Sequence, residues 1–413
     1  MELRPGYKQT EVGVIPEDWE ALPAAQIGRF RGGTGFPLSF QGLKEGAFPF
    51  YKVSDMNNDG NDIFMAASNN WISENDRRTL GAHAFPAGSI VFAKVGAAVF
   101  LERKKILSRP SCIDNNMAAF VLEEERASVS FVHSQLLAKK LGDLVATTAL
   151  PALSGKVLGE MVLAVPPLPE QSAIATALSD VDALLAAQDA LIDKKRAIKQ
   201  GAMQELLTGK RRLPGFSGEW SVKRLDQLAE IRSGGTPSTS RPDFWDGDVL
   251  WVTPTDISAL DGRKFLESTT RKITTLGLKA SSAEIIPANS VVMTTRATIG
   301  ECAINVVPLS TNQGFKNFVP RNSVEVNFLY YLLTTQKQSF IGLCAGSTFL
   351  EIGKTQLTGY EVVIPEKEEQ IAIAEMLSDM DAELTALETQ RAKTAQLKQG
   401  MMQELLTGRI RLV

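Results

Sequence analysis

The sequence predicts an α+β protein with a pseudo-two-fold internal repeat: two mixed α/β units, joined by two long helices that form an antiparallel coiled coil. Three observations indicate this fold. A helix-forming segment occurs twice, each copy carries a narrow apolar seam, and the stretches before the two copies share turns and strand starts. Because an internal copy decides the architecture of a chain, it is considered before any single motif.

The repeated segment runs from Glu170 to Leu213 and again from Glu369 to Leu412. The copies align without a gap, and more than half of the aligned positions are identical. Proline and acidic residues precede the apolar period in both copies, as suits a helix N-terminus. A Thr-Gly pair follows it (Thr208-Gly209 and Thr407-Gly408), where glycine can adopt the left-handed conformation that ends a helix. Each copy is therefore predicted to be one helix of roughly 37 residues, about 55 Å long.

Apolar residues in both copies recur at alternating steps of four and three, which favours a coiled-coil seam over the broad apolar face of a globular helix. The alternative is a pair of ordinary amphipathic surface helices. Both seams turn polar midway, at Gln188 and Lys195 and at Arg391 and Thr394. The residues predicted to form the helix pair and to dock partners are Ile174, Leu178, Val181, Leu185, Ile192, Leu206, Ile373, Leu377, Met380, Leu384, Leu387 and Leu405.

Composition limits the function classes. The 413 residues suffice for two or more domains, and 44 basic against 47 acidic residues give a net charge of −3, which argues against a simple basic DNA-coating protein. Three widely spaced cysteines predict neither a zinc site nor a disulfide framework. With no apolar leader and no run of membrane-spanning length, we expect a cytoplasmic protein.

The globular stretches form two predicted units, residues 1–166 and 214–365, followed by the helical segments 167–213 and 366–413. Arg31-Gly-Gly-Thr34 in the first resembles Arg232 followed by Gly234-Gly235-Thr236 in the second. Further along, Lys94 and then Asn115-Asn116 in the first match Arg296 and then Asn312-Gln313 in the second. The run Phe50 to Met56 reads as a strand, and Pro86 to Phe92 matches Pro287 to Met293, where a turn leads into an apolar strand. If the two helices run antiparallel, the C-terminus returns to the N-terminus.

The order of segments in this chain resembles that of the specificity subunit of type I restriction-modification systems. A variable unit is followed by PPLPEQ, a helix and LLTGK, and a second variable unit is followed by IPEKEEQ, a helix and LLTGR. The EQ-x-x-I-A starts at Glu170 and Glu369 and the shared ends from Lys199 and Lys398 carry the resemblance, which covers essentially the whole chain. It implies two target-recognition domains, each reading one half of a bipartite, asymmetric site in double-stranded DNA.

The resemblance also implies that the helices act as a ruler and as a docking site for two methyltransferase subunits, with restriction subunits completing the nuclease. S-adenosylmethionine, ATP and Mg would be bound by those partner subunits, and no cofactor or metal by this chain. Adenine is the base whose methylation the family implies. No catalytic residue is assigned, because the chain lacks the Asn-Pro-Pro-aromatic motif of amino-methyl transfer: Val165-Pro166-Pro167-Leu168 has neither the asparagine nor the aromatic residue.

Three further patterns are better explained without catalysis. Gly353-Lys354-Thr355 echoes the end of a phosphate-binding loop, but Thr348 stands where the first glycine belongs. Glu102-Arg103-Lys104 lacks the upstream acid of a nuclease triad. His83 and His133, the two histidines of the chain, are too isolated for a metal site.

Candidate DNA contacts follow from residue type, since phosphates are bound by Arg, Lys and Thr, and base edges are read by Arg, Asn, Gln and Lys. For each cation, a solvated surface charge is the competing interpretation, and the glycines beside Arg31 and Arg232 could serve only a tight turn. The predicted DNA-binding residues are Arg31, Lys52, Lys94, Asn115, Asn116, Arg232, Thr236, Arg296, Asn312 and Gln313.

Two other functions are compatible with the pattern of repeats. A self-contained modifying enzyme would need a cofactor loop and a catalytic motif, and neither is visible. A coiled-coil scaffold for proteins alone predicts no salt-dependent affinity for DNA.

Overall fold

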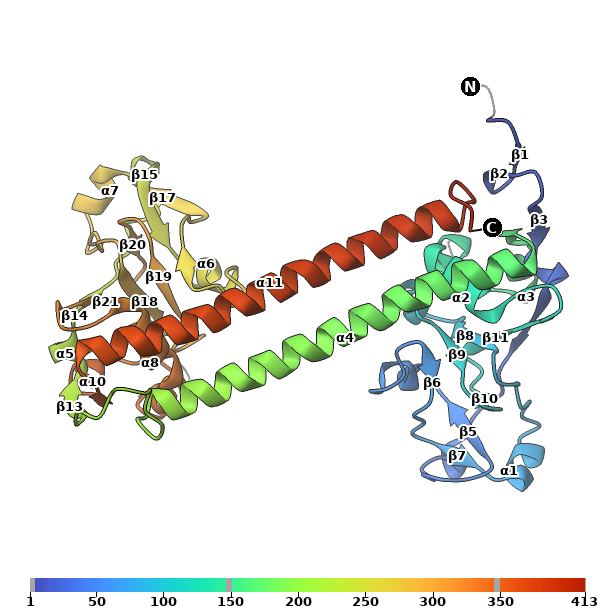
Figure 1. Cartoon of the computed structure of the whole chain (residues 1–413), viewed down its shortest axis with the longest axis horizontal. Helices are drawn as coiled ribbons and strands as arrows, with labels where there is room; N and C mark the ends of the chain where they lie inside the picture. The colour runs from blue at the N-terminus through green and yellow to red at the C-terminus, as the bar shows by residue number, and fades with distance from the viewer. Residues whose placement is uncertain (1–3, 146–150, 345–349, 413) are drawn as a thin grey trace. The chain divides into compact units, whose positions relative to one another are not determined.

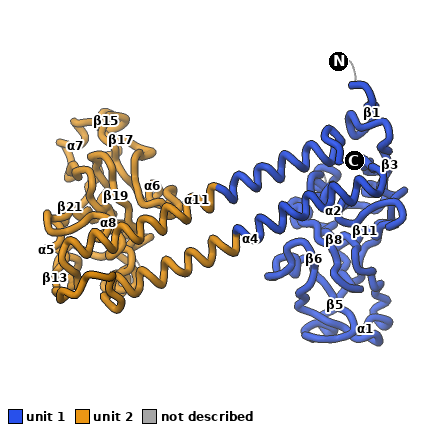
Figure 2. Tube along the Cα trace, viewed as in Figure 1, with its two compact units in different colours: residues 1–188, 390–413 blue, residues 189–389 orange. Residues whose placement is uncertain are grey.

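The computed structural model describes residues 4–145, 151–344 and 350–412. The chain divides into two compact units, of which unit 1 comprises residues 1–188 and 390–413, and unit 2 comprises residues 189–389 (Figure 2). Each unit therefore contains one globular body and part of both long helices, α4 (Leu168–Leu206) and α11 (Lys367–Leu405) (Figure 1). Within the described ranges, no helix is both long enough and apolar enough to cross a membrane.

The body of unit 1 is built around a five-stranded sheet with the order β4-β11-β8-β9-β6, beside a three-stranded sheet with the order β10-β5-β7. The pairs β1-β2 and β12-β3 complete it. The elements are β1 Tyr7–Thr10, β2 Gly13–Pro16, β3 Glu20–Pro23, β4 Gly28–Gly32, β5 Phe48–Tyr51, β6 Phe64–Met65, β7 Trp71–Ile72, α1 Glu74–Thr79, β8 Ile90–Ala93, β9 Lys104–Leu107, β10 Cys112–Ile113, β11 Met117–Leu122, α2 Val129–Ala138, α3 Gly155–Glu160 and β12 Val162–Val165.

Apart from the β1-β2 pair, the described part of unit 2 repeats this topology, with sheets ordered β14-β21-β18-β19-β16 and β17-β15-β20 and the pair β13-β22. Its elements are β13 Ser221–Arg224, α5 Leu225–Leu228, β14 Ala229–Ser233, β15 Trp245–Val252, α6 Pro254–Ser258, β16 Phe265–Leu266, β17 Arg271–Ile273, α7 Thr275–Lys279, β18 Ser290–Thr294, β19 Cys302–Asn305, β20 Ser310–Thr311, β21 Phe315–Pro320, α8 Val326–Thr335, α9 Lys337–Gly342, α10 Lys354–Thr358 and β22 Glu361–Ile364. The predicted α+β fold and its internal repeat are confirmed.

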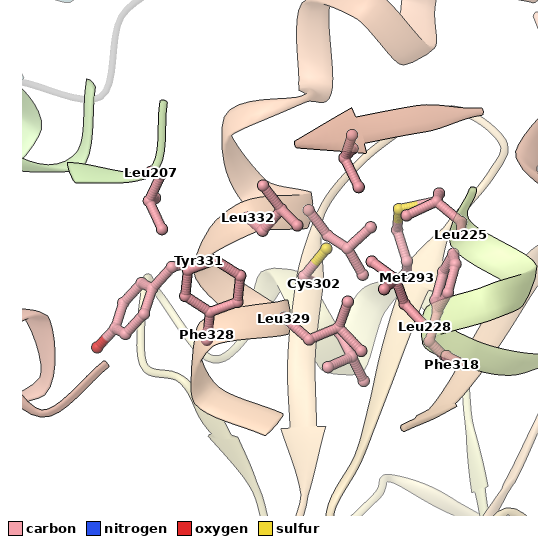
Figure 3. Close-up of a cluster of buried hydrophobic side chains, with 14 of the residues drawn as sticks. Leu207, Leu225, Leu228, Met293, Cys302, Phe318, Phe328, Leu329, Tyr331 and Leu332 are labelled. Carbon is pink, nitrogen blue, oxygen red and sulfur yellow. The ribbon is translucent and has the colours of Figure 1, made fainter. Parts of the chain in front are cut away.

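One helix covers the large sheet in each unit. In unit 2, Phe328, Leu329 and Leu332 of α8 lie in one buried cluster with Met293 and Phe318 of the sheet (Figure 3). In unit 1, α2 supplies the corresponding apolar side chains, Phe131, Val132 and Leu136, to a cluster with Phe92 and Phe120. Side chains alternate between the two faces of a strand, and these residues point to the face that the helix covers.

The long helices run antiparallel within each unit. In unit 1, Lys398 donates to Asp182 at 2.5 Å and Gln188 donates to Thr394 at 3.3 Å. In unit 2, Lys199 of α4 pairs with Asp381 of α11, and Lys195 pairs with Glu383 at 2.6 Å. The pairs Lys398–Asp182 and Lys199–Asp381 are the same interaction in the two sequence copies, with donor and acceptor exchanged between the helices.

The twelve predicted seam residues are all buried or half-buried. The polar positions also fall where the seam pattern places them, since Gln188 is 9% exposed and faces the partner helix. Both helices end slightly before the Thr-Gly pairs, at Leu206 and Leu405. Gly209 and Gly408 follow with φ of 71° and 70°, the left-handed conformation predicted for them.

A three-residue clamp fixes the start of each long helix. In unit 1, the Glu170 carboxylate accepts from the Trp19 indole at 2.9 Å and from Arg411 at 2.6 and 2.8 Å. Tyr7 also donates to the Gly408 carbonyl at 2.9 Å, so the two ends of the described chain meet as predicted.

The equivalent clamp in unit 2 is centred on Glu369, which accepts from Trp220 at 3.2 Å and from both Nε and Nη2 of Arg212 at 2.6 Å. The arginine of unit 2 follows α4 directly, whereas the arginine of unit 1 comes from the C-terminal residues. The residues after α11 therefore do for unit 1 what the connection after α4 does for unit 2.

One predicted strand is shorter than expected. The run Phe50 to Met56 is extended only to Tyr51, and Val53–Asn57 forms a 3-10 helix. The Asp55 carboxylate accepts from the Lys52 amide at 2.6 Å, and this local hydrogen bond turns the chain out of the sheet.

Candidate nucleic-acid interface

Three strands of the large sheet in unit 1 end together at one edge. β4 ends at Gly32, β8 ends at Ala93, and β11 begins at Met117, and their registers pair Gly32 with Ala118 and Ala93 with Met117. The segment before β11 also joins the small sheet, because the Asp114 amide donates to the Tyr51 carbonyl at 2.9 Å. We call this region edge 1; it comprises residues 31–34, 52, 94 and 114–116.

Backbone hydrogen bonds hold edge 1 together. Gly33 N donates to Met117 O at 3.1 Å, Thr34 N to Ile113 O at 3.0 Å, and Lys94 N to Asn116 O at 2.8 Å. These bonds use only main-chain atoms and the Asp114 carboxylate, which accepts from the Asn116 amide at 3.0 Å. Apart from Asp114 and the glycines, the side chains of the edge are thus displayed on a main-chain frame that does not depend on their identity.

Unit 2 has the same frame, edge 2, comprising residues 232–236, 253, 295–296 and 312–314. Gly234 N donates to Phe315 O at 3.4 Å, Gly235 N to Thr311 O at 2.9 Å, and Thr295 N to Gly314 O at 2.7 Å. These bonds make Gly234 the equivalent of Gly33, Thr295 of Lys94, and Asn312-Gln313 of Asp114-Asn115. The sequence match had paired Thr34 with Thr236 and Asn115-Asn116 with Asn312-Gln313; both pairings are wrong by one residue, because side-chain identity had been matched in place of hydrogen-bond register.

The glycines of the edges are required for close approach of two backbones. A Cβ built on Gly33 would lie 2.1 Å from the Asp114 carbonyl oxygen, and one on Gly234 would lie 1.8 Å from that of Asn312. Neither residue has a positive φ. The tight-turn interpretation of these glycines is therefore wrong: they let the end of the edge strand touch the segment that enters β11 or β21.

The predicted DNA-binding residues of unit 1 come together at edge 1. Lys94 lies directly over Gly32, where a built Cβ would meet its Nζ, and Lys52 donates to Gln41 at 3.1 Å. Asn115 and Asn116 are exposed between them. Asp114, which the sequence did not single out, is 5% exposed, and burial raises the pKa of its carboxyl while the charge of Lys52 lowers it.

Arg31 is held by a histidine that sequence reasoning had set aside. Its Nη1 lies 3.2 Å from Nδ1 of His83, and the His83 ring contacts Phe85 edge-on. A guanidinium can only donate, so Nδ1 must be the unprotonated nitrogen and His83 is neutral in this arrangement. Burial, followed by the charges of Arg31 and Arg77, lowers the pKa of His83, in agreement with that state.

We therefore expect acid to release Arg31. Folding favours the neutral imidazole of His83, so its contribution to the free energy of unfolding is fully present above a pH of about 6.5. That contribution is lost as the pH falls from this value to the lowered pKa of His83 in the folded protein. Imidazole NMR titration should place His83 below 6.5, and an Arg31→Ala variant should move its pKa upward. A His83 that titrates at 6.5 or above in the intact protein would contradict the contact.

The predicted residues of unit 2 also reach one edge, but more of them are paired. Thr236 donates to Gln313, Arg296 forms an ion pair with Glu351 at 2.9 Å, and Arg232 forms a two-bond pair with Glu230 at 2.9 Å. Arg232 occupies the position of Arg31, because each pairs with the equivalent residue of the neighbouring strand (Asn317 and Ala119). Its charge is offset by a carboxylate, whereas Arg31 has no carboxylate partner among the described residues.

Cations reach the two edges from different backbone positions. Lys52 of edge 1 is replaced by Thr253 in edge 2, because their amides donate to the equivalent carboxylates of Asp55 and Asp256. Lys94 is replaced by Thr295, because their amides donate to the equivalent carbonyls of residues 116 and 314. Besides Arg232, edge 2 carries Arg296, whose equivalent is Val95, since each forms an isolated bridge to the segment before α10 or α3. The two edges thus share a main-chain frame and differ in charge pattern and hydrogen-bonding groups.

A strained residue follows Arg296. Ala297 has a φ of 56°, in the left-handed region, and its equivalent in unit 1 is Gly96 with a φ of 77°. We expect Ala297→Gly to stabilise unit 2 by about 0.5–1 kcal/mol, because glycine avoids the steric cost but loses more chain entropy. Urea unfolding should show this gain, and Gly96→Ala should destabilise unit 1. An Ala297→Gly variant less stable than the parent would show that the turn is not strained.

The patterns rejected as catalytic have structural roles. Lys104 is 2% exposed, pairs with Glu102 at 2.5 Å and donates to the Lys139 carbonyl at 2.8 Å. His133 is buried with Nε2 2.9 Å from the Lys104 carbonyl oxygen. In the parts of the chain that the structure describes, no group of three or more His, Cys, Asp or Glu side chains could hold a metal ion.

Unit 2 also contains a groove of about 1210 Å³. It is lined by the segment 259–270 and by residues of both long helices, among them Lys199 and Asp381. Lys264 crosses it to donate to Ser378 at 2.9 Å and to Tyr331 at 3.2 Å, so the groove is where the body of unit 2 is fastened to the helix pair.

Comparison with known proteins agrees with this architecture. The model of the type I restriction modification DNA specificity domain matches twice, at residues 16–194 and 217–399. The chain is 38% identical over 165 residues to the type I restriction enzyme MjaIX specificity subunit of Methanocaldococcus jannaschii, covering 40% of this chain and 38% of that protein. With the EcoR124I/EcoR124II specificity subunit of Escherichia coli it shares 27% identity over 218 residues, covering 51% of this chain and 52% of that protein. The chain thus spans about half or less of the length of these two relatives.

A solved structure extends the likeness of the fold to nearly the whole chain. A chain from a study titled as the structural basis of complex assembly and conformational transition of the type I R-M system superposes with a TM-score of 0.61 at 17% identity, covering 96% of this chain and 99% of that one. With both globular bodies and their helices matched by the family model, this chain belongs to the family of the type I restriction modification DNA specificity domain, of which it carries two copies.

Proposed function

We propose that this chain is the DNA-recognition subunit of a type I restriction-modification complex, and that edge 1 and edge 2 each read one half of a bipartite, asymmetric site in double-stranded DNA. The observation that carries the proposal is the pair of edges: one main-chain frame, built twice, with different cations and amides displayed on it. Phosphate contacts position a protein on DNA and base-edge contacts specify sequence. Two frames with different side chains would read two unlike half-sites.

The long helices suit the role of a ruler. Each has 39 residues, which at about 1.5 Å per residue corresponds to roughly 58 Å. The ion pairs Lys398–Asp182 and Lys195–Glu383 oppose sliding of one helix along the other. The gap between the half-sites would then be set by helix length and not by the DNA.

Docking of two methyltransferase subunits needs exposed residues, and the predicted seam residues do not supply them, because the chain itself covers them. An exposed apolar row on α4 was missed: Leu184, Leu191 and Ile198, spaced by seven, are 49%, 40% and 48% exposed. A seven-residue spacing keeps side chains on one helix face, and such a row supports a protein partner at α4. In this proposal the partner subunits, including restriction subunits, supply catalysis and bind S-adenosylmethionine, ATP and Mg.

A genome-wide map of methylated bases tests the function. Cells should carry the methyltransferase subunit encoded beside this chain, with and without the chain itself. We expect a split motif, two short unlike halves around a fixed gap, that appears only with the chain; adenine is the expected base. Methylation that is unchanged without it, or that marks a short continuous site, would favour a scaffold for proteins alone, which predicts no salt-dependent DNA affinity.

A further inference from the structure

Lys316 in β21 is a buried cation without a carboxylate partner among the described residues. Lys316 is 7% exposed, and its Nζ donates one hydrogen bond, 3.4 Å long, to the carbonyl oxygen of the preceding Phe315. A buried charge is costly unless it is paired and hydrogen-bonded. A lysine in this state is suited to a negatively charged ligand that the free protein lacks.

The surroundings of Lys316 already hold a second cation. Arg296 passes close to Gly314, two residues before Lys316, where a built Cβ would be 3.9 Å from its Cδ. Burial is the main cause that lowers the pKa of Lys316; the charges of Arg296 and Lys354 lower it further, and the Glu351 carboxylate raises it. The Glu351 carboxylate, which acts on Lys316, is itself bonded to Arg296 at 2.9 Å.

Unit 1 has no counterpart of this cluster. The register of the strands places Ala118 where unit 2 has Lys316, and the isolated bridges place Val95 and Ala152 where unit 2 has Arg296 and Glu351. The common frame therefore does not require these charges. They distinguish edge 2 from edge 1.

We propose that Lys316 and Arg296 form a binding site for one backbone phosphate of the half-site read by unit 2, and that Glu351 occupies the place of that phosphate in the free protein. The inference rests on the proposed function. A phosphate carries a full negative charge and several acceptor oxygens, so it can satisfy the arginine fork and the lysine together. Glu351 holds Arg296 in place until DNA displaces it, and it disfavours anions that offer less binding energy than a DNA backbone.

The site is tested on the assembled complex with a labelled duplex that contains the mapped bipartite site. Affinity is measured by fluorescence anisotropy at NaCl concentrations from about 50 to about 300 mM, where phosphate contacts make binding strongly dependent on salt. We expect Lys316→Met to weaken binding roughly tenfold at the lower salt concentrations and to reduce the slope of log K against log salt by about 0.9. The methylated sequence should remain the same at both half-sites. Lys223→Met, at an exposed lysine of β13, should change neither quantity.

Glu351→Gln supplies an independent arm that keeps the lysine. Removal of the competing carboxylate should tighten DNA binding about threefold to tenfold and make its dependence on salt concentration steeper. Both effects should disappear in the Lys316→Met/Glu351→Gln double variant. A purely structural Glu351 would leave the affinity unchanged, which would overturn the proposal.

A methylphosphonate scan locates the phosphate. One neutralised position, in the half-site of unit 2, should weaken binding of the parent complex and have no further effect on Lys316→Met. Absence of any such coupling, or relaxed sequence preference in Lys316→Met, would overturn the phosphate site while leaving bipartite recognition standing. Loss of bipartite methylation by the parent itself would instead refute the proposed function.

Discussion

Glu170→Ala is expected to destabilise unit 1 by about 3–5 kcal/mol, the range for removing one partner of a buried ion pair. Glu170 is 1% exposed and is the acceptor for both Trp19 and Arg411, so its loss leaves the indole N–H without this acceptor and leaves Arg411 paired only with the exposed carboxylate of Asp18. The same contacts, hydrogen bonds first, raise the pKa of Arg411. Equilibrium urea unfolding measures the change, and hydrogen exchange of peptides that cover residues 4–30 assigns it to unit 1.

The chain offers matched controls for this clamp. Glu160→Ala breaks an exposed pair with Lys156, 3.9 Å long, and should change stability by less than about 0.5 kcal/mol. Glu369→Ala should reproduce the loss in unit 2, with protection lost around Trp220 instead of Trp19. If Glu170→Ala behaves like Glu160→Ala, the C-terminal residues do not hold unit 1 together.

Gly234→Ala is expected to abolish recognition of one half-site and leave the other intact. The new Cβ would lie 1.8 Å from the Asn312 carbonyl oxygen and 2.4 Å from Thr311 Oγ1, so the segment that carries Asn312 and Gln313 must move. Mispositioned base contacts cost about 1–3 kcal/mol each, and two such contacts correspond to a loss of at least tenfold in specific affinity. Affinity for duplexes with one or the other half-site scrambled measures the effect.

Gly33→Ala provides the reciprocal experiment, because it should impair the half-site that Gly234→Ala spares. Gly218→Ala, where a Cβ meets no atom within 4 Å, should affect neither. Circular dichroism and urea unfolding separate a local shift from unfolding. Equal loss of both half-sites in either variant would mean that the edges do not read the halves separately.

The helices and the internal repeat could be predicted from sequence because their signals are local and occur twice. Seam spacing requires only a period, and Thr-Gly marks a helix end through the backbone freedom of one residue. The order of strands in each body was beyond that reasoning, since short strands such as β10 and β20 have two residues each and are defined by their partners.

The candidate site was predicted in composition but not in register. Lys94 and Arg296 were expected as equivalents, yet the hydrogen bonds of Thr295 place the arginine one residue later. His83 and Glu351 were missed as site residues because each acts through an arginine that lies more than 50 residues away along the chain. Glu230 and Lys316 were missed because strand pairing, which the sequence does not show, brings them to the edge. No spacing rule reports such contacts, whereas the backbone frame shows them at once.

The clamp of unit 1 also has a consequence for how the chain is made. Unit 2 is one continuous segment, residues 189–389, and both residues of its ion pair emerge before synthesis ends. Glu170 must wait for an arginine that is 241 residues later, which at about 5–20 residues per second is a delay of roughly 12–48 seconds. The body of unit 1 therefore lacks this clamp while the whole of unit 2 is being synthesised, although its own strands precede those of unit 2 in the chain.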